Sequence, residues 1–324
     1  MAKAHVAVLR GGPSHTYDLS IRSGNEYLTH LDTLDIPAHD IFIDRHGTWH
    51  RRGVAVPPHV ALEGVDTVLN TLSGEYAEDG QLRQLINQFD MPMPGSSVFA
   101  NHVAFDKART RHNLPVMPGI HIPQMIVFHA VDFKDRIQQA AEELFRTFGP
   151  PYVVKPLRGS ASVSTVLAYT IPDLVEALEL AFIVWDAIVV EEYIRGAEIT
   201  VGTVRNLRDI DIYTLPAVEL RLPGERAVLD YDTKFGHSAE YVCPTTLSYD
   251  TKQAIEAAAR AVHEHLELGT YSRADFRVHP SGRVYFLETN TEPEITAASP
   301  FGVALDAVGV SMPQFIEHLV AYES

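Results

Sequence analysis

The sequence predicts a protein of α/β and α+β domains, three in all, that begins with an open α/β domain. Three observations favour this fold class. The chain has 324 residues, of which 46% are apolar, so it can form more than one hydrophobic core. Strand and helix patterns alternate near the N-terminus. In the C-terminal part, strand patterns surround one long helix.

The first domain is predicted to cover residues 1–98. Residues 4–12, AHVAVLRGG, form an apolar run of strand length that ends in a glycine turn, and residues 17–31 repeat apolar side chains at helical spacing. Residues 39–50 alternate like a strand with a turn at its tip, and residues 65–72 are a further strand candidate. This succession of strand, helix and strand is typical of an α/β domain.

The second domain is predicted to cover residues 99–188 and to be of a small α+β kind. Ser96 and Ser97 are residues of the type that caps helices, so we expect a helix over residues 98–113. Further along, two helical patterns flank two strand patterns. The helices are expected at residues 135–149 and 172–185, and the strands at residues 151–156 and 161–170.

The third domain is predicted to cover residues 189–324. Alanine and leucine in residues 249–268 favour one long helix. Short runs rich in β-branched and aromatic residues predict strands on both sides of this helix. These strands are expected at residues 187–194, 197–206, 212–221, 272–280 and 283–290.

Composition and charge exclude several classes of protein. The formal net charge of −16 disfavours non-specific binding to nucleic acid or to anionic membranes, so we expect neither as a partner. Cys243 is the only cysteine, which rules out an internal disulfide framework. The sequence has no run of about 18 apolar residues, and its start lacks the apolar core of a signal peptide. The cytoplasm is therefore the expected compartment.

Acidic and amide side chains lie on two strand candidates near the C-terminus. If residues 273–278 and 284–290 pair as antiparallel strands, alternation puts Asp275, Glu288 and Asn290 on one face. Two carboxylates and an amide oxygen suit Mg²⁺ ions that also bind the phosphates of a nucleotide. The alternative is a surface hairpin with solvated acids, and these three residues alone leave it open.

Two lysines and three glutamates give this predicted metal site its context. Lys155 ends an apolar strand before a loop with glycine and serine, an arrangement that binds nucleotide phosphates, and Lys107 is a second candidate. Either lysine alone could be a solvated surface charge. Glu191, Glu192 and Glu198 lie where one strand ends and the next begins, so they could meet a purine and its ribose. An ordinary acidic hairpin is the alternative there.

The order of these motifs resembles that of the ATP-grasp superfamily, and in particular of the D-alanyl-D-alanine ligases. The pattern runs from Lys107 through KPLRGSASVS, EEYIRGAE and SRADF to LETNT. The opening GGPSHTYDLS and the acidic loop LSGEYAEDG are similar to two further motifs of the family. The resemblance covers essentially the whole chain. It implies a three-domain ATP-grasp architecture.

The resemblance also implies an activity and its cofactors. The expected enzyme is an ATP-dependent ligase of peptidoglycan biosynthesis that joins a carboxylate to an amine through an acyl phosphate. ADP and phosphate would leave, and the substrates would be amino acids or other small carboxylates. ATP and two Mg²⁺ ions, or Mn²⁺ in their place, would be required. Members of the family are commonly dimers, so a homodimer is compatible with the resemblance.

Roles for individual residues follow from the resemblance alone. Phosphoryl transfer needs positioning and positive charge more than a nucleophilic side chain. Arg273 would stabilise the charge that develops during transfer, and Lys234 would belong to a mobile loop that closes over the γ-phosphate. The nucleotide would be bound by Lys107 and Lys155 at the phosphates, by Glu191, Glu192 and Ile194 around adenine and by Glu198 at ribose, and the metal ions by Asp275, Glu288 and Asn290.

The sequence departs from the family at the substrate positions. Thr16 stands where the family has a glutamate that meets the ammonium of the first D-alanine. Ala161 replaces a serine and Phe235 a tyrosine of the same cluster, and Ser73 replaces the histidine of the acidic loop motif. An ammonium without its charge partner is costly to bury. D-alanine is therefore predicted to be a poor substrate as the first, amine-bearing partner.

A second departure lies in the segment NTEPEIT. Glu294 replaces a family glycine whose N–H faces the oxyanion of the reaction, whereas Ser299 is retained where the family binds the carboxylate of the incoming D-alanine. If Glu294 points inward, its charge repels that carboxylate. If it points outward, it is an ordinary solvated glutamate. The sequence leaves both orientations open.

Three functions are compatible with these features. The protein could be an unusual D-alanyl-D-alanine ligase, a paralogue that joins a different acid to a different amine, or a catalytically silent ATP-binding protein. Retention of Asp275, Glu288 and Asn290 together argues against silence, because a pure nucleotide binder does not need the complete metal site.

Overall fold

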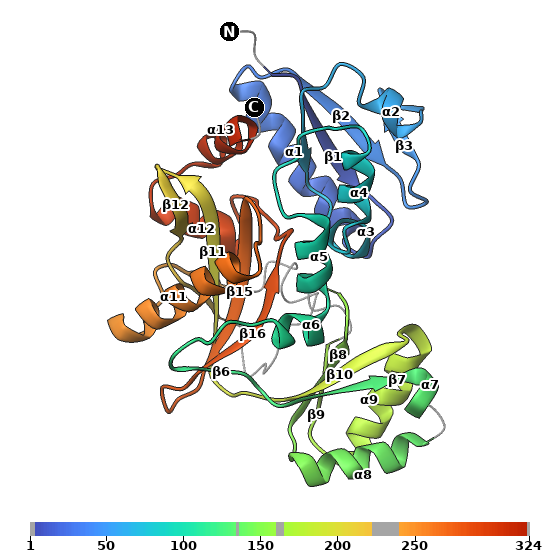
Figure 1. Ribbon diagram of the computed structural model, residues 1–324, viewed down its shortest axis with the longest axis vertical. Coiled ribbons are helices and arrows are strands. Elements are labelled where there is room, and N and C mark those ends of the chain that lie inside the picture. The colour runs from blue at the N-terminus through green and yellow to red at the C-terminus, as the bar shows by residue number, and fades with distance from the viewer. Residues whose placement is uncertain (1–3, 134–135, 160–164, 222–239, 323–324) are drawn as a thin grey trace.

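The computed structural model describes residues 4–133, 136–159, 165–221 and 240–322. Its strands form three sheets that lie at the top, at the lower right and at the left of Figure 1, and both ends of the chain lie near the top. Within the described residues, no helix is long and apolar enough to cross a membrane. The predicted mixture of α/β and α+β architecture is confirmed, whereas the boundaries at residues 98 and 188 stay predictions.

The N-terminal sheet has the strand order β4-β3-β2-β1-β5, and β1 pairs in parallel with both β2 and β5. Helix α1 packs closely on this sheet, because a Cβ on Gly24 would lie 2.5 Å from the Cβ of Arg10. The strands are β1 (Val6–Gly11), β2 (Ala38–Ile43), β3 (Trp49–Arg51), β4 (Val54–Ala55) and β5 (Thr67–Asn70). The helices are α1 (Tyr17–Thr33), α2 (Pro58–Ala61), α3 (Glu75–Glu78) and α4 (Gln81–Asn87).

The middle sheet is antiparallel, with the order β7-β10-β8-β9. Its strands are β7 (Met125–His129), β8 (Tyr152–Pro156), β9 (Val166–Ala168) and β10 (Ala187–Glu192). Helices α7 (Ala130–Phe133), α8 (Ile137–Thr147) and α9 (Ile171–Val184) accompany it in Figure 1. The sequence analysis placed β10 in the third domain, but its partners are β7 and β8. A buried apolar strand does not reveal its neighbours from sequence alone, and β7 was not predicted at all.

The third sheet has the order β14-β13-β11-β15-β16-β6, with β12 paired to β11. The single strand predicted over residues 212–221 is two strands, β12 and β13. The strands are β6 (Ile120–His121), β11 (Ala197–Leu207), β12 (Ile210–Thr214), β13 (Val218–Arg221), β14 (Glu240–Val242), β15 (Tyr271–Val278) and β16 (Val284–Asn290). Helices α11 (Tyr249–His265), α12 (Pro300–Ala307) and α13 (Met312–Tyr322) complete this part.

The helix predicted over residues 98–113 is broken in two. Helix α5 (Val98–Phe105) is capped by Ser97, whose hydroxyl accepts from the N–H of Ala100. Asp106 is extended and caps α6 (Lys107–His112) by accepting from two backbone N–H groups at 3.1 Å. An aspartate competes for backbone donors and therefore favours such a break. As a result Lys107 is the first residue of a new helix.

The first and third sheets share one hydrophobic core. Tyr27 and Leu31 of α1 belong to the same buried cluster as Phe301 of α12 and Phe315 of α13. The C-terminal helix thus lies beside the N-terminal helix, as Figure 1 shows. The core of the middle sheet is separate and consists of residues between 126 and 190. Polar contacts with the middle sheet must therefore position it where the three parts meet.

Replacing Asp106 with alanine should lower the free energy of unfolding by about 1 kcal/mol, because α6 loses its N-cap. Asp106→Asn is the matched control, since asparagine caps helices about as well as aspartate. Urea denaturation of both variants measures the effect. An equal loss in the two variants would contradict the capping role.

His263 predicts a pH dependence of stability. Its side chain is fully buried, its Nδ1 lies 2.7 Å from the Ser272 hydroxyl, and burial followed by the charge of Arg205 lowers its pKa to about 4. The folded state therefore binds this proton more weakly than the unfolded state does. The free energy of unfolding has its full value above pH 6.5 and falls as the pH drops towards 4. The loss is on the order of 3 kcal/mol. Chemical denaturation across this pH range should show it, and His263→Gln should flatten the profile by about that amount.

Candidate active site

Strands β15 and β16 pair as the sequence predicted. Asp275 lies opposite Glu288, and Arg273 lies opposite Asn290, in an antiparallel register with a bulge after Asp275. Carboxylates directly opposite each other on one face repel unless a positive charge lies near them. The hairpin therefore needs cations at this point.

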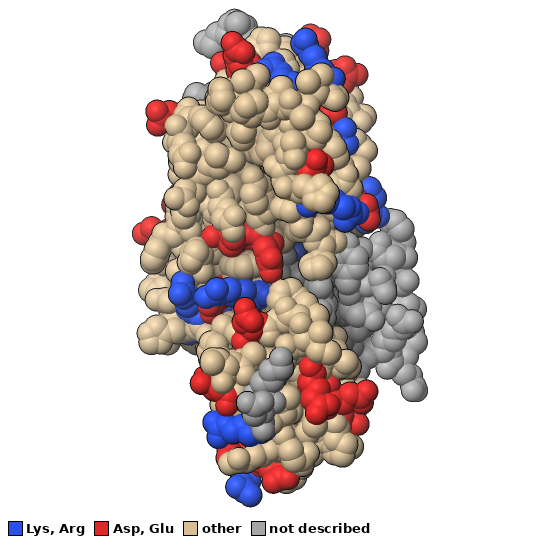
Figure 2. Space-filling view, turned by 90° about the vertical axis from the view of Figure 1, so that its right-hand side faces the viewer, with Lys and Arg blue, Asp and Glu red and all other residues tan. Residues whose placement is uncertain are grey.

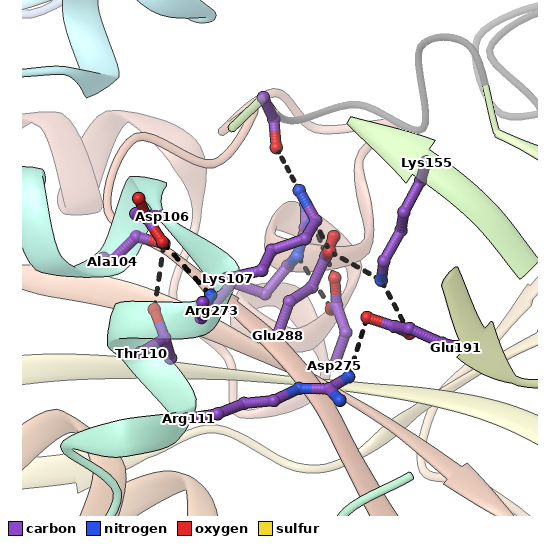
Figure 3. A network of polar contacts seen from close by, with 12 residues as sticks. Ala104, Asp106, Lys107, Thr110, Arg111, Lys155, Glu191, Arg273, Asp275 and Glu288 are labelled. Carbon is purple, nitrogen blue, oxygen red and sulfur yellow. Dashed lines mark hydrogen bonds and ion pairs between the residues drawn. The ribbon is translucent and has the colours of Figure 1, made fainter. Parts of the chain in front are cut away.

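Two lysines supply positive charge to this hairpin from different elements. The Nζ atoms of Lys107, at the start of α6, and of Lys155, on β8, lie 3.9 and 3.6 Å from Oε2 of Glu288. Lys107 also donates to the carbonyl oxygen of Gly159 at 2.7 Å. Figure 3 shows both side chains pointing toward Glu288 from opposite sides. The structure thus brings the two predicted phosphate ligands to the predicted metal site.

Glu191 links Lys155 to an arginine that the sequence analysis missed. Its carboxylate is buried and lies 3.1 Å from Nζ of Lys155 and 2.7 Å from a guanidinium nitrogen of Arg111. Arg111 follows Lys107 by four residues on α6, so helical spacing could have indicated it. Buried charges persist only when paired, and Glu191 holds both cations in place. Its carboxylate is thus engaged by protein rather than turned toward an open ligand site.

The two lysines differ in how their surroundings affect proton binding. Burial lowers the pKa of Lys107, and this effect exceeds the opposing charge of Glu288. Burial also acts on Lys155, but the charges of Glu191 and Glu288 outweigh it and raise the pKa of that lysine. Lys155 is therefore the more firmly charged of the pair.

Asp275 has two partners of its own. Arg273 donates to it twice, at 2.9 and 2.8 Å, and the hydroxyl of Thr200 donates at 2.6 Å. Burial acts to lower the pKa of Arg273, but the charge of Asp275 and its hydrogen bonds outweigh burial, so the pKa is raised overall. Thr200 lies opposite Asp275 on β11, a pairing that the sequence could not indicate.

These donors fit a divalent cation. A carboxylate offers about four lone-pair sites, and Arg273 and Thr200 occupy three of those on Asp275. The amide oxygen of Asn290 accepts one bond, from the N–H of Glu292, and so has a second lone pair. Oxygen donors of this kind suit Mg²⁺. Within the described ranges, no three His, Cys, Asp or Glu side chains form a metal-ligating group, so Asn290 is needed to complete the set.

A small pocket opens beside these residues. Glu78, from the acidic loop of residues 72–80, is buried and accepts from the N–H of Gly74 at 2.7 Å. This loop therefore reaches the predicted metal site. We call this space the phosphate pocket, and it is lined by Glu78, Ala104, Phe105, Lys107, Gly159, Glu288, Thr289, Asn290 and Thr291.

The predicted adenine and ribose residues lie around the link between β10 and β11. Ile194 is buried, and Glu192 is half-buried, with an oxygen 3.4 Å from the N–H of Gln124. Glu198 accepts from Arg277 at 2.7 Å, a contact not foreseen from sequence. A ribose would have to share that carboxylate with Arg277.

The predicted substrate positions Thr16 and Ser73 in the N-terminal part have buried hydroxyl groups. Thr16 is buried, lies 2.7 Å from the hydroxyl of Ser14 and donates to the carbonyl oxygen of Ser73 at 2.9 Å. The hydroxyl oxygen of Ser73 is buried and has no hydrogen-bond partner within the described residues. Thr16 therefore stabilises the turn, whereas Ser73 presents an unused polar group.

The segment after β16 borders a second, small pocket. Glu294 lines it, is partly buried and accepts from the hydroxyl of Thr296 at 3.2 Å. Glu292 is buried and accepts from the hydroxyl of Tyr271 at 3.0 Å. Burial raises the pKa of Glu292 to about 7 against the opposing charge of Arg83. Of the two orientations left open for Glu294, the structure favours the inward one.

Ser299 has a capping role in the structure. Its hydroxyl accepts from the N–H groups of Gly302 and Thr296 and donates to the carbonyl oxygen of Thr296. It thereby begins α12 and is buried. The other three predicted site residues, Lys234, Ala161 and Phe235, lie outside the described residues.

Charge gathers where the parts of the molecule meet. On the face shown in Figure 2, acidic and basic side chains lie next to each other at mid-height, where the surface is hollowed. Side chains of both signs are therefore available to a ligand at this place.

Comparison with known proteins agrees with this geometry. Residues 116–321 match the family described as D-ala D-ala ligase C-terminus. The D-alanine–D-alanine ligase of Gloeobacter violaceus is 32% identical over 317 residues, which are 97% of this chain and 98% of that protein. The enzyme of the same name from Pelotomaculum thermopropionicum is 29% identical over 316 residues, covering 97% and 95% of the two chains.

Solved structures show the same fold. The D-alanine–D-alanine ligase of Bacillus anthracis has a TM-score of 0.78 at 26% identity and covers 99% of this chain and 97% of its own. The VanG D-Ala:D-Ser ligase of Enterococcus faecalis, at 22% identity, shares the fold with a TM-score of 0.82 over all of both chains. With its metal-site hairpin and its converging lysines, this chain belongs to the D-alanine–D-alanine ligase family of ATP-grasp proteins.

Proposed function

We propose that this protein is an ATP-dependent ligase that activates a carboxylate as an acyl phosphate and joins it to an amine. One observation carries the proposal. Lys107, Lys155 and Arg273, from three different elements, converge on the oxygen donors Asp275 and Glu288 beside one pocket. A site of this composition fits the triphosphate of ATP and its metal ions.

The residues of the phosphate pocket have separate tasks in this reaction. Lys107 and Lys155 bind and orient the phosphates, and Glu191 with Arg111 keeps Lys155 in position. When bound by Asp275, Glu288 and Asn290, Mg²⁺ supplies charge neutralisation for phosphoryl transfer. No nucleophilic side chain is required, because the carboxylate of the substrate itself attacks the γ-phosphate.

Arg273 stabilises the phosphoryl group during its transfer. It is buried and pinned to Asp275 by two hydrogen bonds, so its position is fixed before the substrates bind. A preorganised cation of this kind stabilises charge that develops on the phosphoryl group and on the tetrahedral intermediate. The amine then attacks the acyl carbon, an amide bond forms and phosphate leaves.

Substrate choice is the part in which this chain departs from its relatives. The relatives named above are D-alanine–D-alanine ligases, which supports amino acids as substrates. Thr16 does not provide a negative charge, and its hydroxyl is already engaged. ATP with Mg²⁺ or Mn²⁺, a cytoplasmic location and a homodimer complete the proposal. A catalytically silent nucleotide binder is less well supported, because a pure binder does not need Asp275, Glu288 and Asn290 together.

Mg²⁺-ATP should raise the melting temperature of the protein, because a ligand selective for the folded state stabilises it by mass action. Glu288→Gln should reduce this shift by removing one negative charge from the metal site. Glu176→Gln, on the exposed side of α9, is the matched control and should behave like the wild type. Differential scanning fluorimetry with and without the nucleotide measures the shift. Absence of a shift in the wild type, or an equal one in Glu288→Gln, would count against the nucleotide site.

D-alanine should be a poor acyl donor. Burying its α-ammonium opposite a threonine rather than a carboxylate costs several kcal/mol in effective terms, which corresponds to about a hundredfold or more in kcat/KM. Phosphate release under saturating Mg²⁺-ATP measures the reaction. The triple change Thr16→Glu, Ala161→Ser and Phe235→Tyr should improve it. Efficient dipeptide formation by the unchanged protein at sub-millimolar D-alanine would refute this prediction.

A further inference from the structure

The segment that ends β16 separates two pockets. Glu288 and Asn290 line the phosphate pocket. Glu292 and Glu294, which follow the end of β16 at Asn290, line the second pocket. A ligand in the second pocket is therefore adjacent to the site of phosphoryl transfer, on the far side of Asn290.

The two pockets lie along one row of side-chain pairs. Asp275 faces Glu288, and Arg273 faces Asn290. The hydroxyl of Tyr271, two residues further along β15, donates to Glu292. Beyond the metal pair and the Arg273 pair, and past the end of β16, Tyr271 and Glu292 thus form a third pair through this hydrogen bond. It carries a buried carboxyl group.

The second pocket favours a positive ligand. It is lined by two glutamates and by no lysine or arginine among the described residues. Tyr271 and Asn70, which donate to Glu292, are neutral. Arg83 is the positive group that acts on Glu292, and its guanidinium also donates to the carbonyl oxygens of Met93 and Pro94. Burial favours the neutral form of Glu292, so Glu294 supplies the principal negative charge of this lining.

Ser73 points independently to a ligand in this pocket. Ser73 lines the second pocket, and its buried hydroxyl oxygen has no hydrogen-bond partner in the part of the chain that the structure describes. A buried hydroxyl left unsatisfied costs on the order of 1–3 kcal/mol. A bound ammonium group would satisfy it. The apolar wall of Leu19, Leu72 and Ile295 suits the methylene groups of such a ligand.

We propose that the second pocket binds a cationic nitrogen on the side chain of the acid substrate, so that the enzyme activates a diamino acid. The inference rests on the proposed function, which places the reacting carboxylate at Arg273. An α-ammonium lies about 2.5 Å from its carboxyl carbon, so it does not extend to the third pair. A side-chain ammonium two bonds further out reaches toward the third pair. Glu292 and Glu294 would then hold the side-chain ammonium, while the α-ammonium of the same acid would still face Thr16.

The experiment compares 2,4-diaminobutyrate with norvaline, in D and L forms, as acyl donors. The two acids have the same chain length and differ in one ammonium against one methyl group. ADP release is measured with saturating Mg²⁺-ATP and excess D-alanine as the amine. For one enantiomer of diaminobutyrate, we expect a KM at least tenfold lower than that for norvaline. Glu294→Gln and Glu292→Gln should each raise that KM about tenfold relative to the KM for norvaline.

Controls separate this inference from the proposed function. Glu176→Gln should match the wild type, and Glu294→Gln decides the matter if Glu292→Gln does not fold. Equal KM values for the two acids, or equal effects of the variants on both, would overturn the inference. If no acid supports ADP release, the proposed ligase activity fails. The second pocket is then tested by the melting temperature of the protein, which should rise with diaminobutyrate and not with norvaline. The same response to both acids would overturn the inference about this pocket.

Discussion

The arrangement of the site depends on repulsion between two facing carboxylates. Asp275 and Glu288 lie opposite each other on adjacent strands, an arrangement that is unfavourable without positive charge. Lys107, Lys155 and Arg273 supply it from α6, β8 and β15. The break at Asp106 is part of this solution, because it makes Lys107 the first residue of a helix whose next turn carries Arg111. The break in the helix and the balance of charge at the site therefore depend on each other.

The same polar centre also holds the middle sheet in position. The first and third sheets share an apolar core through α1 and α13, whereas the core of the middle sheet is its own. Contacts such as Lys155 with Glu288, and Arg111 with Glu191, cross from the middle sheet to the neighbouring elements. Phosphates that bind between these lysines would replace protein carboxylates as their partners. Ligand binding is thus coupled to the placement of the middle sheet.

Sequence reasoning predicted features that depend on local pattern. Strand alternation placed Asp275, Glu288 and Asn290 on one face, and the structure confirms that register. Features that depend on pairing across the chain were out of reach. Nothing in the sequence of β10 shows that β7 and β8 are its partners, and nothing near Thr200 shows that it faces Asp275. The burial of Glu292 also depends on α1, β5 and α4, which lie far away in sequence.

The amino-acid side of the site has changed in several places that share one electrostatic theme. Position 16 lacks a carboxylate, and its threonine now binds the turn itself. Positions 292 and 294 both carry carboxyl groups, and both line the second pocket. A change of ligand requires charge at new places, because an ammonium must be met wherever its chain places it. The phosphate pocket meanwhile keeps its donors and cations, since the position of ATP does not depend on which acid it activates.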